Sequence, residues 1–236
     1  WCTYNPARET GFEDLGAVAV GYVADLQLVE ELDGRDPSAV FVGGKQMVEN
    51  GILLLPPVEN LEKIPFSETI NLDEIKPEDC FLKVSDENCE VAVVECKNRN
   101  RMQFEISWEK LPIKKGAVDI NDHLDYCYVA VFNRFGLKTK CIAVYHGFGL
   151  KSGAMATTIS HDCHNIIVAY RNPADGALAV NRLREISGGI VAVNEGSVIG
   201  EVQLPVAGLM SILPCVELVE KLDKVSEKLK MIWEEE

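Results

Sequence analysis

The sequence has 236 residues, of which 47% are hydrophobic and 25% are charged, and this balance of a folded globular protein excludes global disorder. Its 23 Lys and Arg residues face 37 Asp and Glu residues, so the net charge of −14 argues against binding to nucleic acid or to an anionic membrane surface. The longest run of apolar residues and glycine, 15–24, is too short to cross a bilayer. The opening residues WCTYNPARETG show no signal peptide, and a start at Trp1 indicates a piece of a longer protein.

The cysteine pattern points to free thiols. Eight cysteines, at positions 2, 80, 89, 96, 127, 141, 163 and 215, contain no C-x-x-C pair. They are too sparse for a disulfide scaffold, and most lie in apolar runs such as 125–131. We therefore expect reduced, mostly buried thiols, which predicts a cytoplasmic protein.

The first block, residues 1–55, predicts a small all-β module. Residues 23–29 alternate partly between apolar and polar, as a half-buried strand does. The short apolar segments 39–42 and 45–48 flank Gly43-Gly44, and this pair favours a hairpin because both turn positions tolerate positive φ. The prolines and charges of the following segment, 56–69, predict a linker.

The remaining chain, residues 70–236, predicts a mixed domain, so the fold class we expect is α+β. Four segments rich in Val and Ile are typical of buried strands: 90–96, 128–132, 141–145 and 165–170.

Two helices and a hairpin are expected in the second half of this domain. Asn172 as N-cap and Pro173 at the first helical position predict a helix that ends at Gly188-Gly189. Strands 190–193 and 197–204 then form a hairpin. A last helix begins near Pro214, and its apolar stripe indicates either core or a subunit interface; the stripe consists of Leu218, Leu222, Val225, Leu229 and Ile232.

An internal similarity links two segments 37 residues apart. Lys114-Lys-Gly-Ala117 corresponds to Lys151-Ser-Gly-Ala154, and the same offset matches Asp125 with Asp162, Val131 with Val168, and Arg134 with Arg171. The pattern indicates two related β units packed side by side. Chance, or convergent turn chemistry, stays open as the alternative because a single pair of units is too few to define a repeat.

The densest group of polar side chains is Ser160-His-Asp-Cys-His-Asn165, directly before a predicted strand. Three interpretations compete: a metal site with His161, Cys163 and His164 as ligands, a Cys163 nucleophile with a histidine base, and a hydrogen-bonded structural loop. Against the first, neighbouring residues on a strand point apart. Against the second, nucleophile and base normally come from distant segments.

Several segments carry a resemblance to a known family. They are NPAR at 5–8, GAVAVGYVADL at 16–26, VFVGGK at 40–45, GFGLKSGAMATTISHDCHNIIV at 147–168, AVNRL at 179–183, SGGIVAVNEG at 187–196 and LPVAGLMS at 204–211. With them the sequence resembles the C-terminal portion of bacterial and archaeal adenine deaminases, members of the amidohydrolase superfamily, over nearly its whole length. Cys163 departs from the serine usual in that family, and Met155 departs from a smaller aliphatic residue.

The resemblance implies a parent enzyme that hydrolyses adenine to hypoxanthine and ammonia. Residues 1–55 then belong to the small β-sandwich that flanks a metal-bearing (β/α)8 barrel, and 70–236 form the family's own C-terminal domain. The family's divalent metal, Mn, Fe or Zn, belongs to that barrel, and this chain is expected to hold no cofactor. Its four histidines include no H-x-H pair, so the fragment alone is expected to be inactive.

The implied partners are the N-terminal barrel of the same polypeptide and adenine, with a second copy of the chain as a further candidate and with no nucleic acid and no membrane. A non-catalytic interaction or oligomerisation domain is the alternative function.

The candidate substrate-pocket residues are His161, Asp162, His164 and Asn165. Their side chains can pair with the ring nitrogens and the exocyclic amine of a purine, so we expect the loop to face the barrel. The alternative is that Asp162 and Asn165 only cap the turn into strand 165–170.

Overall fold

The computed structural model describes residues 1–32, 37–55, 69–86, 88–98 and 103–233. The chain divides into two compact units, residues 1–59 and 60–236. The predicted boundaries of 1–55, 56–69 and 70–236 stay a prediction, and nearly all of the proposed linker, 56–68, lies outside the described residues.

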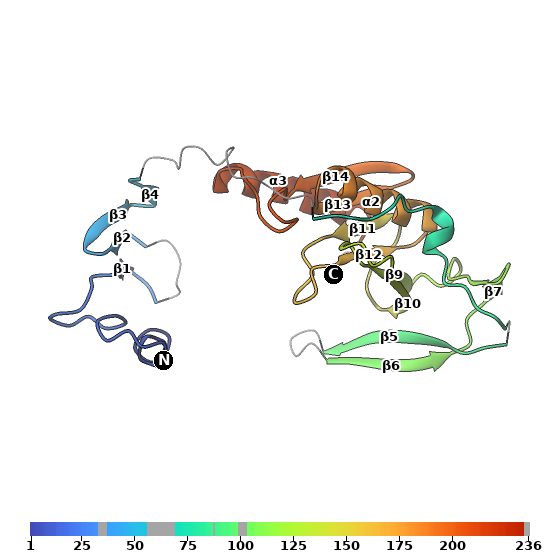
Figure 1. Cartoon of the computed structure of the whole chain (residues 1–236), viewed down its shortest axis with the longest axis horizontal. Helices are drawn as coiled ribbons and strands as arrows, with labels where there is room; N and C mark the ends of the chain where they lie inside the picture. The colour runs from blue at the N-terminus through green and yellow to red at the C-terminus, as the bar shows by residue number, and fades with distance from the viewer. Residues whose placement is uncertain (33–36, 56–68, 87, 99–102, 234–236) are drawn as a thin grey trace. The chain divides into compact units, whose positions relative to one another are not determined.

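The first unit is built around a small antiparallel sheet with the strand order β1-β2-β3-β4 (Figure 1). Its strands are β1 (Leu26–Leu28), β2 (Ala39–Val42), β3 (Lys45–Glu49) and β4 (Ile52–Leu53). The predicted hairpin around Gly43 and Gly44 is confirmed, since both glycines take positive φ between β2 and β3.

A short helix, α1 (Tyr4–Glu9), corrects the expectation of a purely β module. It escaped the sequence pattern because none of its residues is buried, so it has no amphipathic periodicity to detect. Its end is fixed by Thr10, whose hydroxyl donates to the carbonyl oxygen of Pro6 at 2.7 Å.

The second unit is a mixed α+β domain built on an eight-stranded sheet with the order β14-β13-β11-β12-β9-β10-β5-β6 (Figure 1). All neighbouring strands are antiparallel except β10 and β5. The strands are β5 (Val91–Asn98), β6 (Gln103–Glu109), β9 (Tyr126–Phe132), β10 (Lys140–His146), β11 (Ala154–Thr157), β12 (Ile166–Tyr170), β13 (Gly189–Asn194) and β14 (Ser197–Gln203). A separate hairpin joins β7 (Ile113–Lys114) to β8 (Ala117–Val118).

Helices cover both faces of this sheet. On one face, α2 (Pro173–Glu185) and the 3-10 helix η2 (Pro77–Cys80) pack on a core that includes Phe132, Val168 and Tyr170. On the other, α3 (Cys215–Lys230) packs on β13 and β14. Successive side chains of β12 point to opposite faces of the sheet, so Val168 and Tyr170 belong to the core under α2 and Ala169 belongs to the core on the other face.

The predicted helices and the β13–β14 hairpin are confirmed. The Asn172 side chain caps α2 by accepting a hydrogen bond from the backbone N–H of Asp175 at 2.9 Å. Most of the predicted apolar stripe belongs to the core of the chain: Val225 of α3 and Ile232 just after it are buried, while Leu222 is 36% exposed. No helix in the described part of the chain is long and apolar enough to span a membrane.

The sequence predicted free, mostly buried thiols. None of the eight cysteines, all of them within the described ranges, forms a disulfide, but the expected burial is wrong, since only two are buried. Cys80 and Cys127 are buried, whereas Cys2, Cys141, Cys163 and Cys215 are exposed.

Gly189 permits the close approach of β13 and β14 and provides a test of the fold. Its φ is +143°, and a Cβ atom there would overlap the carbonyl oxygen of Val202. Because this clash adds to the backbone strain, we expect Gly189→Ala to lower the free energy of unfolding by about 2–4 kcal/mol in chemical denaturation. Gly196→Ala in the turn of the same hairpin is the control, since its φ is +74° but its surroundings are open. It should cost only about 1–2 kcal/mol, and equal losses from both variants would contradict the argument.

Candidate functional site

The polar loop 160–165 connects β11 to β12 and is anchored at both ends. Thr158, which is fully buried, accepts a hydrogen bond from the Gly189 N–H at 2.8 Å, and its hydroxyl donates to the carbonyl oxygen of Gly208. Within the loop, the His164 N–H donates to the Ser160 carbonyl oxygen at 2.9 Å. Asp162 and His164 have φ values of +66° and +47°, a left-handed conformation that is uncommon outside glycine.

The side chains of this loop mostly extend into solvent. The side chains of His161 and Asp162 are 95% and 88% exposed, and their Nδ1 and Oδ1 atoms lie 3.1 Å apart. An ion pair this exposed contributes little to stability. His164 is exposed, whereas Asn165 is half-buried and accepts a hydrogen bond from the Asn133 side chain at 3.4 Å.

The backbone of the loop is held by a buried arginine. Arg134, 2% exposed, follows β9 and donates from Nε to the carbonyl oxygen of His164. It also donates to Thr69 Oγ1 at 3.1 Å and to the Ala207 carbonyl oxygen at 2.9 Å. Desolvation lowers the pKa of Arg134 below its usual value. The loop therefore combines a fixed backbone with side chains that are free to contact another surface.

The arginine at the matched position of the internal similarity, Arg171, makes the reciprocal contacts. It follows β12 and donates to the carbonyl oxygens of His123 at 2.7 Å and Ile120 at 3.2 Å, in the loop that precedes β9. Since β9 and β12 pair antiparallel, the end of each strand lies beside the start of the other. The two similar segments thus lie side by side, and each holds the loop of the other.

The geometry separates the three interpretations of the loop. Within the described ranges, no group of three or more His, Cys, Asp or Glu residues is placed to hold a metal ion, so the described residues, including this loop, do not fit the family's metal. Cys163 Sγ lies 3.0 Å from Ser160 Oγ, a contact that lowers the pKa of the thiol, but no hydrogen bond from a histidine to this thiol is found among the described residues.

The capping alternative is corrected in its details. Asp162, almost fully exposed, contacts His161 and not the backbone, and Asn165 contacts a side chain. The loop is instead held by its own backbone hydrogen bonds and by Arg134, a donor from the segment that follows β9.

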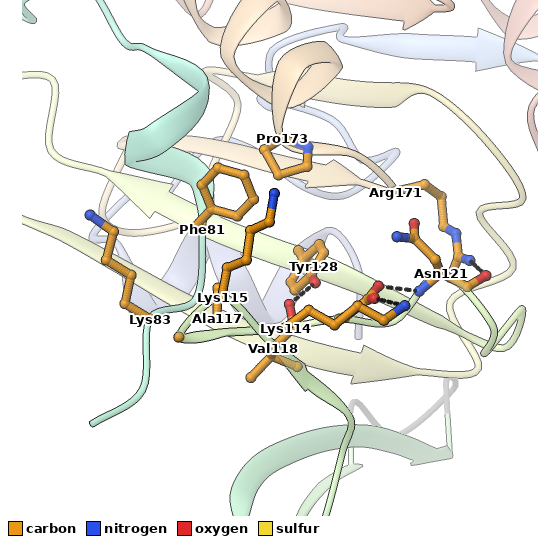
Figure 2. Close-up of a pocket in the computed structure, with 12 residues that line it drawn as sticks. Phe81, Lys83, Lys114, Lys115, Ala117, Val118, Asn121, Tyr128, Arg171 and Pro173 are labelled. Atoms are coloured by element: carbon orange, nitrogen blue, oxygen red, sulfur yellow. Dashed lines mark hydrogen bonds and ion pairs between the residues drawn. The ribbon is translucent and has the colours of Figure 1, made fainter. Parts of the chain in front are cut away.

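A pocket that no sequence pattern predicted lies at the other end of β12 (Figure 2). The cavity measures about 500 Å³, within the usual range for small-molecule sites. Its lining comes from four separate segments: Phe81 and Lys83 after η2, residues 114–121 around β7 and β8, Tyr128 on β9, and Arg171 with Pro173 at the start of α2. The signal available in the sequence was a local run of lysines in an acidic chain.

The chain was compared with known families and proteins. A family described as "Adenine deaminase C-terminal domain" matches residues 104–235, and one described as "Amidohydrolase family" matches residues 1–47. The adenine deaminase of Kosmotoga olearia is 35% identical over 231 residues, which cover 97% of this chain and 39% of that protein.

Two further relatives give the same result. The adenine deaminase of Desulforamulus reducens is 34% identical over 98% of this chain and 40% of its own length. Adenine deaminase 1 of Rhizobium meliloti is 36% identical over 88% of this chain and 36% of its own length. The chain spans about two fifths of the length of the curated relatives it matches.

The contact between Ser160 and Cys163 predicts a measurable thiol reactivity. Because the Ser160 hydroxyl stabilises the thiolate and lowers the pKa of Cys163, Ser160→Ala should raise this pKa and reduce the thiolate fraction at a given pH. We expect alkylation of Cys163 by iodoacetamide at pH 7.5 to slow about two- to tenfold, measured by peptide mass spectrometry.

The other thiols serve as controls in the same experiment. Exposed Cys141 should react at the same rate in both proteins. Burial raises the pKa of Cys80 and of Cys127 to about 12, so these two should stay unmodified in the native chain. An unchanged rate at Cys163 would show that the serine does not activate the thiol.

Proposed function

Because the chain belongs to the adenine deaminase C-terminal domain family, we propose that it works within an enzyme that hydrolyses adenine to hypoxanthine and ammonia. The reaction is that of a larger protein, since this chain spans about two fifths of its relatives. The match of residues 1–47 to the amidohydrolase family supports a catalytic barrel in the rest of that polypeptide. There a divalent metal would activate the attacking water, and we assign no residue of this chain to it.

Within that enzyme, we assign loop 160–165 to the wall of the substrate pocket. One observation carries this proposal: His161 and Asp162 hold almost fully exposed side chains on a backbone that Arg134 fixes. Asp162 and His164 also hold left-handed backbones, and non-glycine residues in such conformations concentrate at functional sites. A purely structural loop would instead use these polar groups internally.

The side chains suit a purine. The Asp162 carboxylate can accept a hydrogen bond from the exocyclic amine, and an imidazole can donate to or accept from a ring nitrogen. Such hydrogen bonds gain strength when a second surface closes over the loop and excludes water.

The test of this proposal uses the full-length enzyme. We expect His161→Ala, Asp162→Asn and His164→Asn each to lower kcat/KM for adenine about tenfold or more, the loss of about 1.4 kcal/mol that one hydrogen bond to the substrate represents. Asparagine is chosen at 162 and 164 because it tolerates left-handed φ. The melting temperature should change by no more than about 2 °C, as is usual for exposed positions.

His146→Ala is the matched control, because this half-exposed histidine ends β10, outside the loop, beside Glu95. Its kcat/KM should stay at the wild-type value. If the melting temperature of the loop variants falls while their activity per folded molecule is retained, the loop is structural and the proposal is wrong.

Assembly of subunits is the second candidate function, and the exposed edge strand β6 favours it. Phe104, Ile106 and Trp108 lie on one face of this strand and are 48%, 65% and 67% exposed. Three of the four stripe residues within α3, Leu218, Val225 and Leu229, pack on the core, so the stripe leaves little apolar surface for a second copy. A row of large apolar side chains on an open sheet edge is a template for pairing with another chain.

The sequence of β6 is complementary to itself. When two copies pair antiparallel about Ile106, Phe104 faces Trp108 and Glu105 faces Ser107, so apolar side chains meet and no two carboxylates are opposed. A second copy of the chain is therefore the partner that this edge fits.

The edge pairing predicts a defined dimer. Ile106→Lys would place two lysines opposite each other at the symmetry axis, so we expect the dimer to dissociate, as measured by light scattering coupled to size-exclusion chromatography. Ser107→Lys is the control, because its lysine would face Glu105 of the second copy and the dimer should persist. At about 100 μM, any dimer with a Kd well below that value would be visible. A wild-type chain that is monomeric at this concentration would therefore contradict this candidate.

A further inference from the structure

We infer that the pocket between η2, the β7–β8 hairpin and the start of α2 binds a small organic anion that carries a planar ring (Figure 2). This site is independent of the proposed role of loop 160–165, since the loop precedes β12 and the pocket lies where β12 ends.

The charge of the lining is the first argument. The pocket is lined by Lys83, Lys114, Lys115 and Arg171 but by only one acidic residue, Asp119, in a chain where acidic residues outnumber basic ones by 37 to 23. Asp119 is already neutralised, because it pairs with the Lys114 ammonium, which lowers the pKa of that carboxyl group. The remaining cations leave a local positive charge.

Lys115 is the cation best placed to meet a ligand. It sits in the turn between β7 and β8 with a φ of +54°, and Figure 2 shows its side chain running across the pocket toward Phe81 and Pro173. Lys83 lies at the rim. For neither ammonium does the described part of the chain provide a hydrogen bond or an ion pair, so both are available to an anion.

Arg171 contributes charge but no hydrogen bond to the ligand. Its guanidinium already donates to the carbonyl oxygens of Ile120, Asn121 and His123. The donors that distinguish one anion from another are therefore the two free lysines.

The walls of the pocket are apolar and aromatic. Phe81 is 40% exposed, and the ring of Pro173 lies at the start of α2. The ring of Tyr128 is held in place, because its hydroxyl donates to the Val118 carbonyl oxygen at 2.6 Å and its ring stacks on Tyr170 with 5.3 Å between centroids. Rigid rings of this kind provide flat surfaces against which a planar ligand can pack.

These two features together define the ligand class. A neutral ring would leave the Lys115 ammonium without a partner, and a bare anion would leave the aromatic walls without contact. A ring that bears a phosphate or a carboxylate satisfies both, and either anion offers the oxygens that an ammonium binds.

The test measures binding to the 236-residue chain by isothermal titration calorimetry at low salt. The four probes are adenosine 5′-monophosphate, benzoate, adenosine and inorganic phosphate. We expect at least one of the two ring-bearing anions to bind at least about tenfold more tightly than both adenosine and phosphate, and to weaken as salt is added. Tighter binding of the nucleotide would assign a phosphate ligand, and tighter binding of benzoate a carboxylate ligand.

Variants locate the binding to this pocket. Lys115→Gln, which removes the charge but keeps a polar, unbranched side chain, should weaken binding about tenfold or more, and Phe81→Ala should also weaken it. Lys151→Gln is the matched control, because Lys151 is an exposed lysine at the position equivalent to Lys114 in the second similar segment. Its affinity should equal that of the wild type.

The inference would be overturned if neither ring-bearing anion binds up to about 10 mM, a range that covers even weak sites. It would also be overturned if adenosine binds equally well, or if Lys115→Gln has unchanged affinity. The melting temperature of each variant shows whether it is folded. The experiment requires no deaminase activity, so failure of the proposed function would leave its outcome intact.

Discussion

The reciprocal contacts of Arg134 and Arg171 are the interaction on which the larger unit depends. Arg134 follows β9 and binds the His164 carbonyl oxygen in the loop before β12. Arg171 follows β12 and binds several carbonyl oxygens in the loop before β9, the strand paired with β12. Carbonyl groups buried without donors are costly, and arginine offers five donors in one plane, so a single side chain can satisfy a whole loop. Because arginine stays charged even when desolvation lowers its pKa, these contacts hold across the physiological pH range.

The loop before β12 and the loop before β9 are both fixed by arginine, but the two ends of β12 differ in what they present to solvent. Before the strand, Arg134 holds a backbone whose side chains are turned to solvent, as a surface that meets another part of a protein requires. After the strand, Arg171 supports residues 120–123 beside a cavity with rigid aromatic walls. Buried arginine contacts thus support an exposed loop at one end of β12 and a pocket at the other.

Elements defined by local chemistry could be predicted from the sequence, and those that depend on tertiary contacts could not. The cap at Asn172 and the hairpin of β13 and β14 involve neighbouring residues, so their patterns are visible in the chain. The donor that holds loop 160–165 comes from Arg134, and no local pattern reveals such a contact. The pocket escaped prediction for the same reason, while β6, although its residues alternate, was overlooked beside the more apolar strands.

The pairing of β10 with β5 has a consequence for the order of folding. It is the only parallel pair in the described sheet, and it joins Val93 to Val144 across a long stretch of intervening chain. Closing that stretch costs more conformational entropy than forming a hairpin, so we expect the β5–β6 ribbon to dock late and to open first. Amide hydrogens of this ribbon would then exchange with solvent before those of β9 and β12, as those of a subglobal opening unit do.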